Sequence, residues 1–188
     1  MKISVKKEKD CKVVNWANGT STELFVFPAD GNFQTRDFTF RISTATVEAE
    51  ETTFSDFSSL TRILMILEGN ITLIHEGRYT KQLAPFDQDT FDGSWPTKSQ
   101  GKVRDFNVMF KENVEGKVEH LAIKSGQMES FMLAGTHDFF FVQNGSFRLN
   151  DLEIKKNDLL IIEREETESI DLEYLEAGDL VKVEIVLS

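Results

Sequence analysis

The chain has 188 residues, of which 40% are hydrophobic and 11% aromatic, so it is large enough to bury the core of a globular protein. Its formal net charge of -11 disfavours nucleic acid as a partner, because binding phosphates requires clustered lysine and arginine. Cys11 is the one cysteine, which excludes an intrachain disulfide.

The start of the sequence does not resemble a secretory signal, because residues 1–14 carry charge and lack an uninterrupted apolar stretch. The longest apolar run, residues 63–67, is far shorter than the roughly 20 residues that cross a bilayer. These features predict a cytoplasmic protein that has no membrane partner.

Short alternating runs between turn residues are typical of β-strands, and helical periodicity is hard to find. In residues 38–44 the alternation places Phe40 and Ile42 on one face of a strand. Arg41 and Ser43 then lie on the opposite face. This run predicts a strand with one aromatic and one polar face.

Two later runs repeat this pattern. In residues 105–110, Asp105 and Asn107 lie opposite apolar residues such as Phe106. In residues 180–187, apolar side chains occupy every second position. Such strands are those of a sandwich or a barrel.

The sequence also contains an internal repeat, which is visible when Gly69 is aligned with Gly145. Each glycine follows an apolar strand and precedes a second strand, as in the hairpin of a jelly roll. A turn at residues 84–87 matches another at residues 156–158, and a polar linker covers residues 113–117.

The sequence therefore predicts an all-β protein with two jelly-roll (double-stranded β-helix) halves that arose from an internal repeat. A jelly roll with a Glu-Gly turn, here Glu68-Gly69, resembles the cupins, and this resemblance implies a bicupin with two cupin-like halves. We place the halves at residues 1–115 and 116–188. The first half carries the motifs described below, and the second is expected to keep the scaffold without the polar inward set, since Asp138 stands at the place of Arg62.

The resemblance to cupins raises the question of a metal, which cupins commonly hold with histidines and a glutamate. The positions that the spacing assigns to these ligands carry Arg62, Phe57 and Ser55. The histidines follow no ligand spacing, and we interpret them as surface or strand-end residues: His75, His120 and His137. The sequence predicts no metal and no other cofactor.

Several blocks, in order along residues 12–110, resemble the HutD/Ves family. They are Trp16-x-Asn18-Gly19-Thr20-Ser21-Thr22-Glu23-Leu24, Phe40-Arg41-x-Ser43-x-Ala45, Phe54-Ser55-x-Phe57, Arg62-x-Leu64-x-x-Leu67-Glu68-Gly69, Phe91-Asp92-Gly93 and Asp105-Phe106-Asn107-Val108-Met109. The resemblance implies a bicupin with a regulatory, ligand-binding role in histidine utilisation. For some members of the family, the implied ligand is a degradation intermediate such as formylglutamate.

The candidate site is the mouth or interior of the first half, where two arginines would favour an anion because the guanidinium fork suits a carboxylate. The predicted ligand-binding residues are Trp16, Asn18, Thr22, Arg41, Ser43, Arg62, Phe91, Asp92, Asp105 and Asn107. No catalytic residue is assigned. In the alternative interpretation, Arg41 and Asp105 face solvent or pair with each other, and Trp16 packs.

The leading hypothesis is a metal-free, small-molecule-binding bicupin of the HutD/Ves type. It would be a regulatory or accessory protein of amino-acid (histidine) catabolism that binds a carboxylated metabolite, as a monomer or homodimer. One alternative is a metal-independent cupin enzyme, such as an isomerase or epimerase, that uses acid/base side chains. Another is a protein-interaction module whose pocket is vestigial. A titratable group with a perturbed pKa inside the pocket would favour the enzyme.

Overall fold

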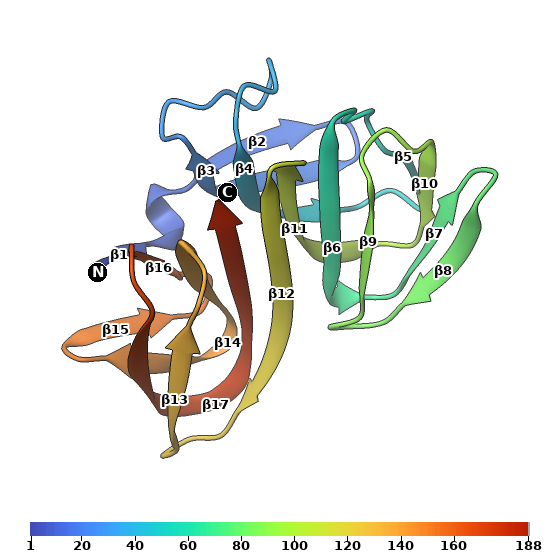
Figure 1. The fold of residues 1–188 in the computed structure, drawn as a ribbon. Helices are drawn as coiled ribbons and strands as arrows, with labels where there is room; N and C mark the ends of the chain where they lie inside the picture. Colours follow the sequence, from blue (N-terminus) through green and yellow to red (C-terminus); the bar gives the residue numbers. More distant parts are fainter. Residues whose placement is uncertain (188) are drawn as a thin grey trace. The chain divides into compact units, whose positions relative to one another are not determined.

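The computed structural model describes residues 1–187, which form β-strands and one short 3-10 helix in two compact units (Figure 1). The N-terminal unit is residues 12–112. The C-terminal unit combines residues 1–11 with the chain from Asn113 onward. In the part of the chain that is described, no helix is long and apolar enough to span a membrane.

The N-terminal unit consists of two antiparallel sheets. A six-stranded sheet has the order β2-β3-β4-β11-β6-β9, and a four-stranded sheet has the order β5-β10-β7-β8. The strands are β2 (Lys12–Trp16), β3 (Gly19–Phe27), β4 (Phe40–Val47), β5 (Glu51–Thr53), β6 (Leu60–Gly69), β7 (Ile71–His75), β8 (Tyr79–Leu83), β9 (Gln88–Asp92), β10 (Thr97–Gln100) and β11 (Val103–Lys111).

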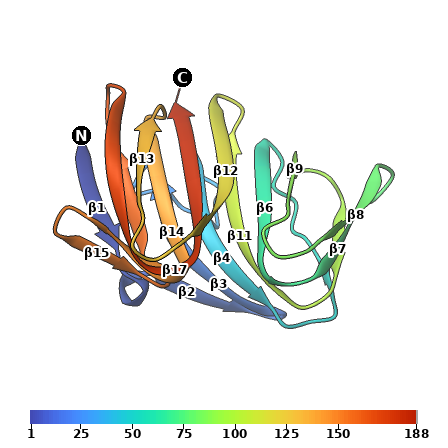
Figure 2. The same cartoon turned by 90° about the horizontal axis from the view of Figure 1, so that it is seen from below.

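The C-terminal unit is built on one seven-stranded sheet, with the order β1-β16-β14-β17-β12; β13 pairs with β17, and β15 pairs with β14. Its elements are β1 (Lys2–Lys6), the 3-10 helix η1 (Glu8–Asp10), β12 (Val114–Ile123), β13 (Met128–Leu133), β14 (His137–Leu149), β15 (Leu152–Lys155), β16 (Leu159–Glu163) and β17 (Glu168–Leu187). The longest described strands of this unit are β14, with 13 residues, and β17, with 20, and they are neighbours in the sheet (Figure 2).

Residues 1–11 belong to the C-terminal unit, whereas the sequence analysis placed them in the first half. Strand β1 pairs antiparallel with β16, so that Ile3 lies opposite Ile162. Ile3 and Val5 also pack against the core of the C-terminal unit. The physical reason is that these two apolar side chains find their partners more than 150 residues away, and alternation alone does not identify a partner.

The internal repeat is confirmed by backbone hydrogen bonds in the turn that follows each hairpin. Phe86 N donates to Ile66 O over 2.7 Å, and Asn157 N donates to Val142 O over 2.7 Å. In both turns an aspartate at the next position accepts a hydrogen bond at Oδ2 from the backbone N–H three residues earlier. The two halves therefore share this local architecture, and the order β4-β11-β6-β9 in one corresponds to β12-β17-β14-β16 in the other.

The aligned glycines also occupy equivalent positions. Gly69 has φ 84° and Gly145 has φ 81°, which is the left-handed region that glycine tolerates. A Cβ on Gly69 would lie 2.5 Å from the carbonyl oxygen of Lys102. A Cβ on Gly145 would lie 2.7 Å from that of Ala177. In each half the glycine thus allows two backbone segments to approach closely.

The core of the N-terminal unit has two apolar clusters. The first contains Val47, Leu64, Ile66, Ile71, Leu73, Leu83, Phe91 and Val103, with Phe54 and Trp95 packed against it. The second contains Phe38, Phe57, Leu60 and Met109, with Val26 and Phe33 packed against it. Both clusters include residues of β6 and β11, and these two strands also carry polar side chains that are described next.

Candidate functional site

A set of buried polar side chains lies on the inward face of the six-stranded sheet in the N-terminal unit. Arg41 and Ser43 come from β4, Arg62 from β6, and Asp105 and Asn107 from β11; each is at most 6% exposed. They share this face because every second residue of a strand points the same way, in line with the core residues of the same strands. The predicted alternation thus accounts for Arg41, Ser43, Asp105 and Asn107, and the strand order β4-β11-β6 places Arg62 beside them.

Arg62 lies between the two apolar clusters, with its guanidinium among three phenyl rings. Its Cζ is 4.8 Å from the ring centroid of Phe54, 5.4 Å from that of Phe57 and 5.2 Å from that of Phe91. The faces of these rings attract a cation. Burial nevertheless lowers the pKa of Arg62 to about 10, with the Asp105 carboxyl acting against this effect.

Arg41 is held by a different set of partners. Its Nε donates to Glu23 Oε2 over 2.8 Å, and its Nη1 donates to Ser43 Oγ over 2.9 Å. The ring of Phe33 covers it, at 4.1 Å from Cζ to centroid. Arg41 and Arg62 are neighbours through β11, because both pair in register with Met109. Two guanidinium groups are therefore concentrated in one buried region.

Asp105 is a buried carboxyl group beside these cations. Burial raises its pKa to about 7, although Arg62 and Arg104 act to lower it. At neutral pH this side chain therefore exists in both its protonated and its ionised form. It can donate or accept a proton as the occupancy of the site changes.

Two polar atoms of this site have no hydrogen-bond partner. They are Nε of Arg62 and Oδ1 of Asn107, each with essentially no accessible surface. Leaving a buried donor or acceptor unpaired costs about 1–3 kcal/mol. A bound molecule that offers an acceptor to Arg62 would remove this cost.

The other predicted site residues lie elsewhere. Trp16 is 37% exposed on the edge strand β2. Asn18 lies in the turn before β3, where its carbonyl accepts a bond from Glu48 N. Thr22 pairs with Thr44, so it lies on the face opposite to Ser43.

Phe91 is inward and contacts Arg62, but its neighbour Asp92 is exposed and caps its own turn. The Asp92 carboxylate accepts hydrogen bonds from the backbone N and the Oγ of Ser94, at 2.8 and 2.7 Å. Asp92 therefore serves the turn rather than the buried set.

Glu23, which accepts the hydrogen bond from Arg41 Nε, was not among the predicted site residues. Glu23 pairs with Ser43 and shares its face, but an irregularity between Glu23 and Phe25 shifts the register of β3 against β4. Such a bulge is invisible to simple alternation. Phe33 and Phe54 were missed for a related reason, since both lie outside the strands.

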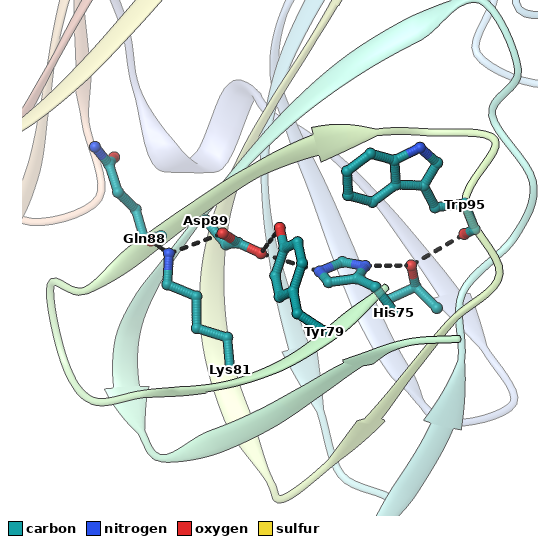
Figure 3. A network of polar contacts seen from close by, with 7 residues as sticks. His75, Tyr79, Lys81, Gln88, Asp89 and Trp95 are labelled. Atoms are coloured by element: carbon teal, nitrogen blue, oxygen red, sulfur yellow. Dashed lines mark hydrogen bonds and ion pairs between the residues drawn. The ribbon is translucent and has the colours of Figure 1, made fainter. Parts of the chain in front are cut away.

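A second buried network surrounds His75 in the same unit (Figure 3). Asp89 accepts hydrogen bonds from His75 Nε2 at 2.9 Å, Tyr79 Oη at 3.0 Å and Lys81 Nζ at 2.8 Å. Burial would raise the pKa of Asp89, but the hydrogen bonds from these partners bring it below the ordinary value. His75 is the last residue of β7, in agreement with the strand-end interpretation, but it is 1% exposed and therefore not a surface residue.

Both ring nitrogens of His75 have polar partners. Nδ1 lies 2.8 Å from Thr97 Oγ1, and this hydroxyl donates to the carbonyl of Trp95 at 3.0 Å. Nε2 faces the Asp89 carboxylate. The network connects β7, β8 and β10 of the four-stranded sheet to β9 of the six-stranded sheet, so it holds the two sheets together.

The donor atoms of the buried site do not fit a metal ion. Arg62 stands where the cupin spacing places a metal ligand, and its guanidinium is a hydrogen-bond donor without a lone pair to offer. Among residues 1–187, no three histidine, cysteine, aspartate or glutamate side chains gather closely enough to hold such an ion.

Comparison with solved structures defines the class of protein. HutD from Pseudomonas fluorescens SBW25 matches with a TM-score of 0.83 at 18% identity, over 100% of both chains. A conserved protein of unknown function from Pseudomonas aeruginosa PAO1 gives 0.83 at 21% identity, over 99% of this chain and 100% of that one. The bacterial pirin YhhW from Escherichia coli, solved with nickel(II), gives 0.75 at 12% identity, over 99% of both. With two equivalent halves, the chain is a bicupin.

The sequence identifies the family within this class. Residues 8–181 match the HutD family model, which covers most of the chain, so the protein belongs to the HutD family. No curated protein matches it. The resemblance noted in the sequence analysis is therefore confirmed at the level of the family.

Proposed function

We propose that the protein binds a small carboxylate inside its N-terminal unit and acts as a regulatory or accessory protein of amino-acid catabolism. The carboxylate would accept hydrogen bonds from Arg62, with Arg41 and Asn107 alongside. Membership in the HutD family supports the proposal that this role belongs to histidine catabolism. The metabolite would occupy the region between the two apolar clusters.

The observation that carries the proposal is the unpartnered Nε of Arg62. This guanidinium is buried and ringed by Phe54, Phe57 and Phe91, so water cannot easily replace the missing acceptor. A hydrogen bond that involves a charged group stabilises by about 1.5–3 kcal/mol. A carboxylate supplies a planar acceptor that matches the guanidinium fork.

Isothermal titration with formate, followed by larger carboxylates from amino-acid breakdown, tests this proposal. Formate is a suitable first probe because the HutD structure from Pseudomonas fluorescens is described as a formate condition. Formamide serves as the uncharged control of similar shape. We expect a carboxylate to bind and formamide to give no heat.

The matched variants are Arg62→Met and Arg148→Met. Methionine keeps apolar bulk among the phenyl rings but removes the charge, so Arg62→Met should weaken binding tenfold or more, or by about 1.4 kcal/mol. Arg148 is 43% exposed in the other unit, and its loss should leave binding unchanged. The proposal fails if no carboxylate binds, or if folded Arg62→Met binds as tightly as the wild type.

A second candidate function, a metal-independent acid/base enzyme, is favoured by one observation. Asp105 combines burial beside the arginines with a pKa of about 7, which suits a residue that exchanges protons at neutral pH. This candidate is tested by incubating the protein with a carboxylic acid that it binds, in D₂O, and monitoring the acid by NMR. Solvent deuterium would enter the ligand with the wild type and not with Asp105→Asn.

A further inference from the structure

The interior of the C-terminal unit contains its own set of charged residues, which corrects the expectation that this half keeps only the scaffold. Phe140 pairs with Lys182 as Leu64 pairs with Asn107. Since the repeat aligns Leu64 with Phe140, Lys182 takes the position of Asn107. By the same alignment, Asp138 takes the position of Arg62.

These charged residues lie in the inward rows of their strands. The core of the C-terminal unit includes Phe140 of β14, Ile162 of β16 and Leu180 of β17. Asp138, Arg164 and Lys182 are each two residues from one of these core positions and therefore share their faces. Glu184 and, on β12, Glu119 continue the same rows, because they pair with Asp138 and Lys182 respectively. These five charged residues thus lie together at one end of the apolar core.

The residues are also strongly buried. The side chain of Asp138 has no exposed surface, that of Arg164 is 2% exposed and that of Lys182 is 11% exposed. Arg164 donates from Nη2 to Asp138 Oδ2. Lys182 Nζ lies 3.6 Å from Glu184 Oε2 and 3.8 Å from Glu119 Oε2, which is close for ion pairs but long for hydrogen bonds.

Two polar atoms of these residues make no hydrogen bond. Asp138 Oδ1 is an acceptor without a partner, and Arg164 Nε is a donor without one; both atoms are buried. The ammonium group of Lys182 supplies further donors. The acceptor is Asp138 Oδ1, and the two cationic donors are Arg164 and Lys182. A small molecule that carries both a positive and a negative charge could pair with all of them. A simple anion would leave Asp138 Oδ1 without a donor, and a simple cation would leave Arg164 Nε without an acceptor.

We propose that the C-terminal unit binds a small zwitterion, an α-amino acid, whose ammonium group donates to Asp138 Oδ1 and whose carboxylate accepts from Arg164 Nε and Lys182 Nζ. This site is separate from the carboxylate site of the N-terminal unit. It rests on different residues and on a different set of unpaired atoms. The duplicated scaffold would then present two interiors with different charge patterns for two different ligands.

The test is isothermal titration of the full chain with glycine, which has both charged groups and no side chain. Acetate and methylammonium each carry one of the two groups. We expect glycine to bind at least tenfold more tightly than either. Saturating formate should not abolish glycine binding, so the test is independent of the N-terminal site. The proposal is overturned if glycine gives no heat or if acetate binds equally well.

Three variants locate the site. Asp138→Asn and Lys182→Met should each weaken glycine binding tenfold or more, while Lys155→Met, a change at a lysine that is 65% exposed on β15, should not. Lys182→Met decides the question if Asp138→Asn does not fold, because Lys182 lies nearer the surface and methionine keeps most of its packing. Glycine binding that persists at the wild-type level in folded Lys182→Met overturns the assignment.

Discussion

Arg41 donates from Nε to Glu23 Oε2 over 2.8 Å, and the two side chains are 5% and 22% exposed. The carboxylate of Glu23 therefore occupies one edge of a buried guanidinium that would otherwise be open to an anionic ligand. Burial lowers the pKa of Arg41, and the bond to Glu23 opposes this change. Glu23 thus stabilises the cation and also competes with a ligand for it.

Replacing Glu23 by glutamine should therefore strengthen the binding of formate. The amide keeps the size of the side chain but removes a negative charge from the site, so affinity should rise several-fold, or by about 1 kcal/mol. Titration calorimetry measures this, with Glu76→Gln as a control at an exposed ion pair to Lys98. A weaker affinity in Glu23→Gln would show that Glu23 orients Arg41 for the ligand instead.

The pKa of Asp105 predicts how stability depends on pH. This group is protonated in the unfolded chain only below its ordinary value of 3.8, but in the folded chain up to about 7. Between these values the folded state holds the extra proton, so the free energy of unfolding falls as pH rises, by about 4 kcal/mol at most. Asp105→Asn removes this dependence and should gain stability relative to the wild type from pH 5 to pH 8.

Urea denaturation across this pH range measures the effect. Asp92→Asn is the control, because hydrogen bonds from Ser94 lower the pKa of this exposed carboxyl instead of raising it. The affinity for a carboxylate should also depend on the protonation of Asp105, since an ionised Asp105 repels an anion. Affinity for formate should therefore decline above pH 7, and a flat profile would separate Asp105 from the site.

The glycines of the repeat give a third prediction. Gly69→Ala and Gly145→Ala should each destabilise by roughly 2–3 kcal/mol, because each Cβ would clash with a backbone carbonyl and each φ is positive. Gly77 also has a positive φ, of 74°, but no atom lies within 4 Å of its added Cβ. Gly77→Ala should then cost only about 1 kcal/mol. Similar losses at all three positions in thermal melts would mean that φ dominates and the close approach does not matter.

The network around His75 gives a fourth prediction. His75→Ala leaves the buried Asp89 carboxylate without one of its donors and removes the contact with Thr97, so it should cost about 3 kcal/mol. Lys81 donates to the same carboxylate but is 43% exposed, and Lys81→Ala should cost less than about 1 kcal/mol. Denaturant titration compares the two variants. Equal losses would indicate that the carboxylate is solvated in spite of its burial.

Much of the fold could be predicted from local patterns, because alternation and turn residues act over a few positions. Alternation alone placed Arg41 and Ser43 on one face and, on another strand, Asp105 and Asn107 on one face. These residues lie close to Arg62 because β4, β11 and β6 are neighbours in the sheet in that order, which is the order expected for a jelly roll.

The remaining features depend on contacts between distant segments. Glu23 reaches Arg41 through an irregular strand pairing, and Asp89 meets His75 through the packing of two sheets. The alternation of Asp89 with Phe91 was a usable signal, since it places a carboxylate on an otherwise buried face. Trp16 was selected from the family motif, and only the structure shows that it lies on an exposed edge strand.

The pairing of β1 with β16 has a consequence for folding during synthesis. The N-terminal unit, residues 12–112, is continuous and can fold as soon as it leaves the ribosome. The C-terminal unit cannot be completed in this way, because its first strand, β1, remains unpaired until its partner, residues 159–163, has been synthesised. A fragment that starts at residue 116 would expose the apolar edge of β16, and an edge of this kind recruits other chains. We expect such a fragment to aggregate, and a synthetic peptide of residues 1–11 added in trans to restore its solubility.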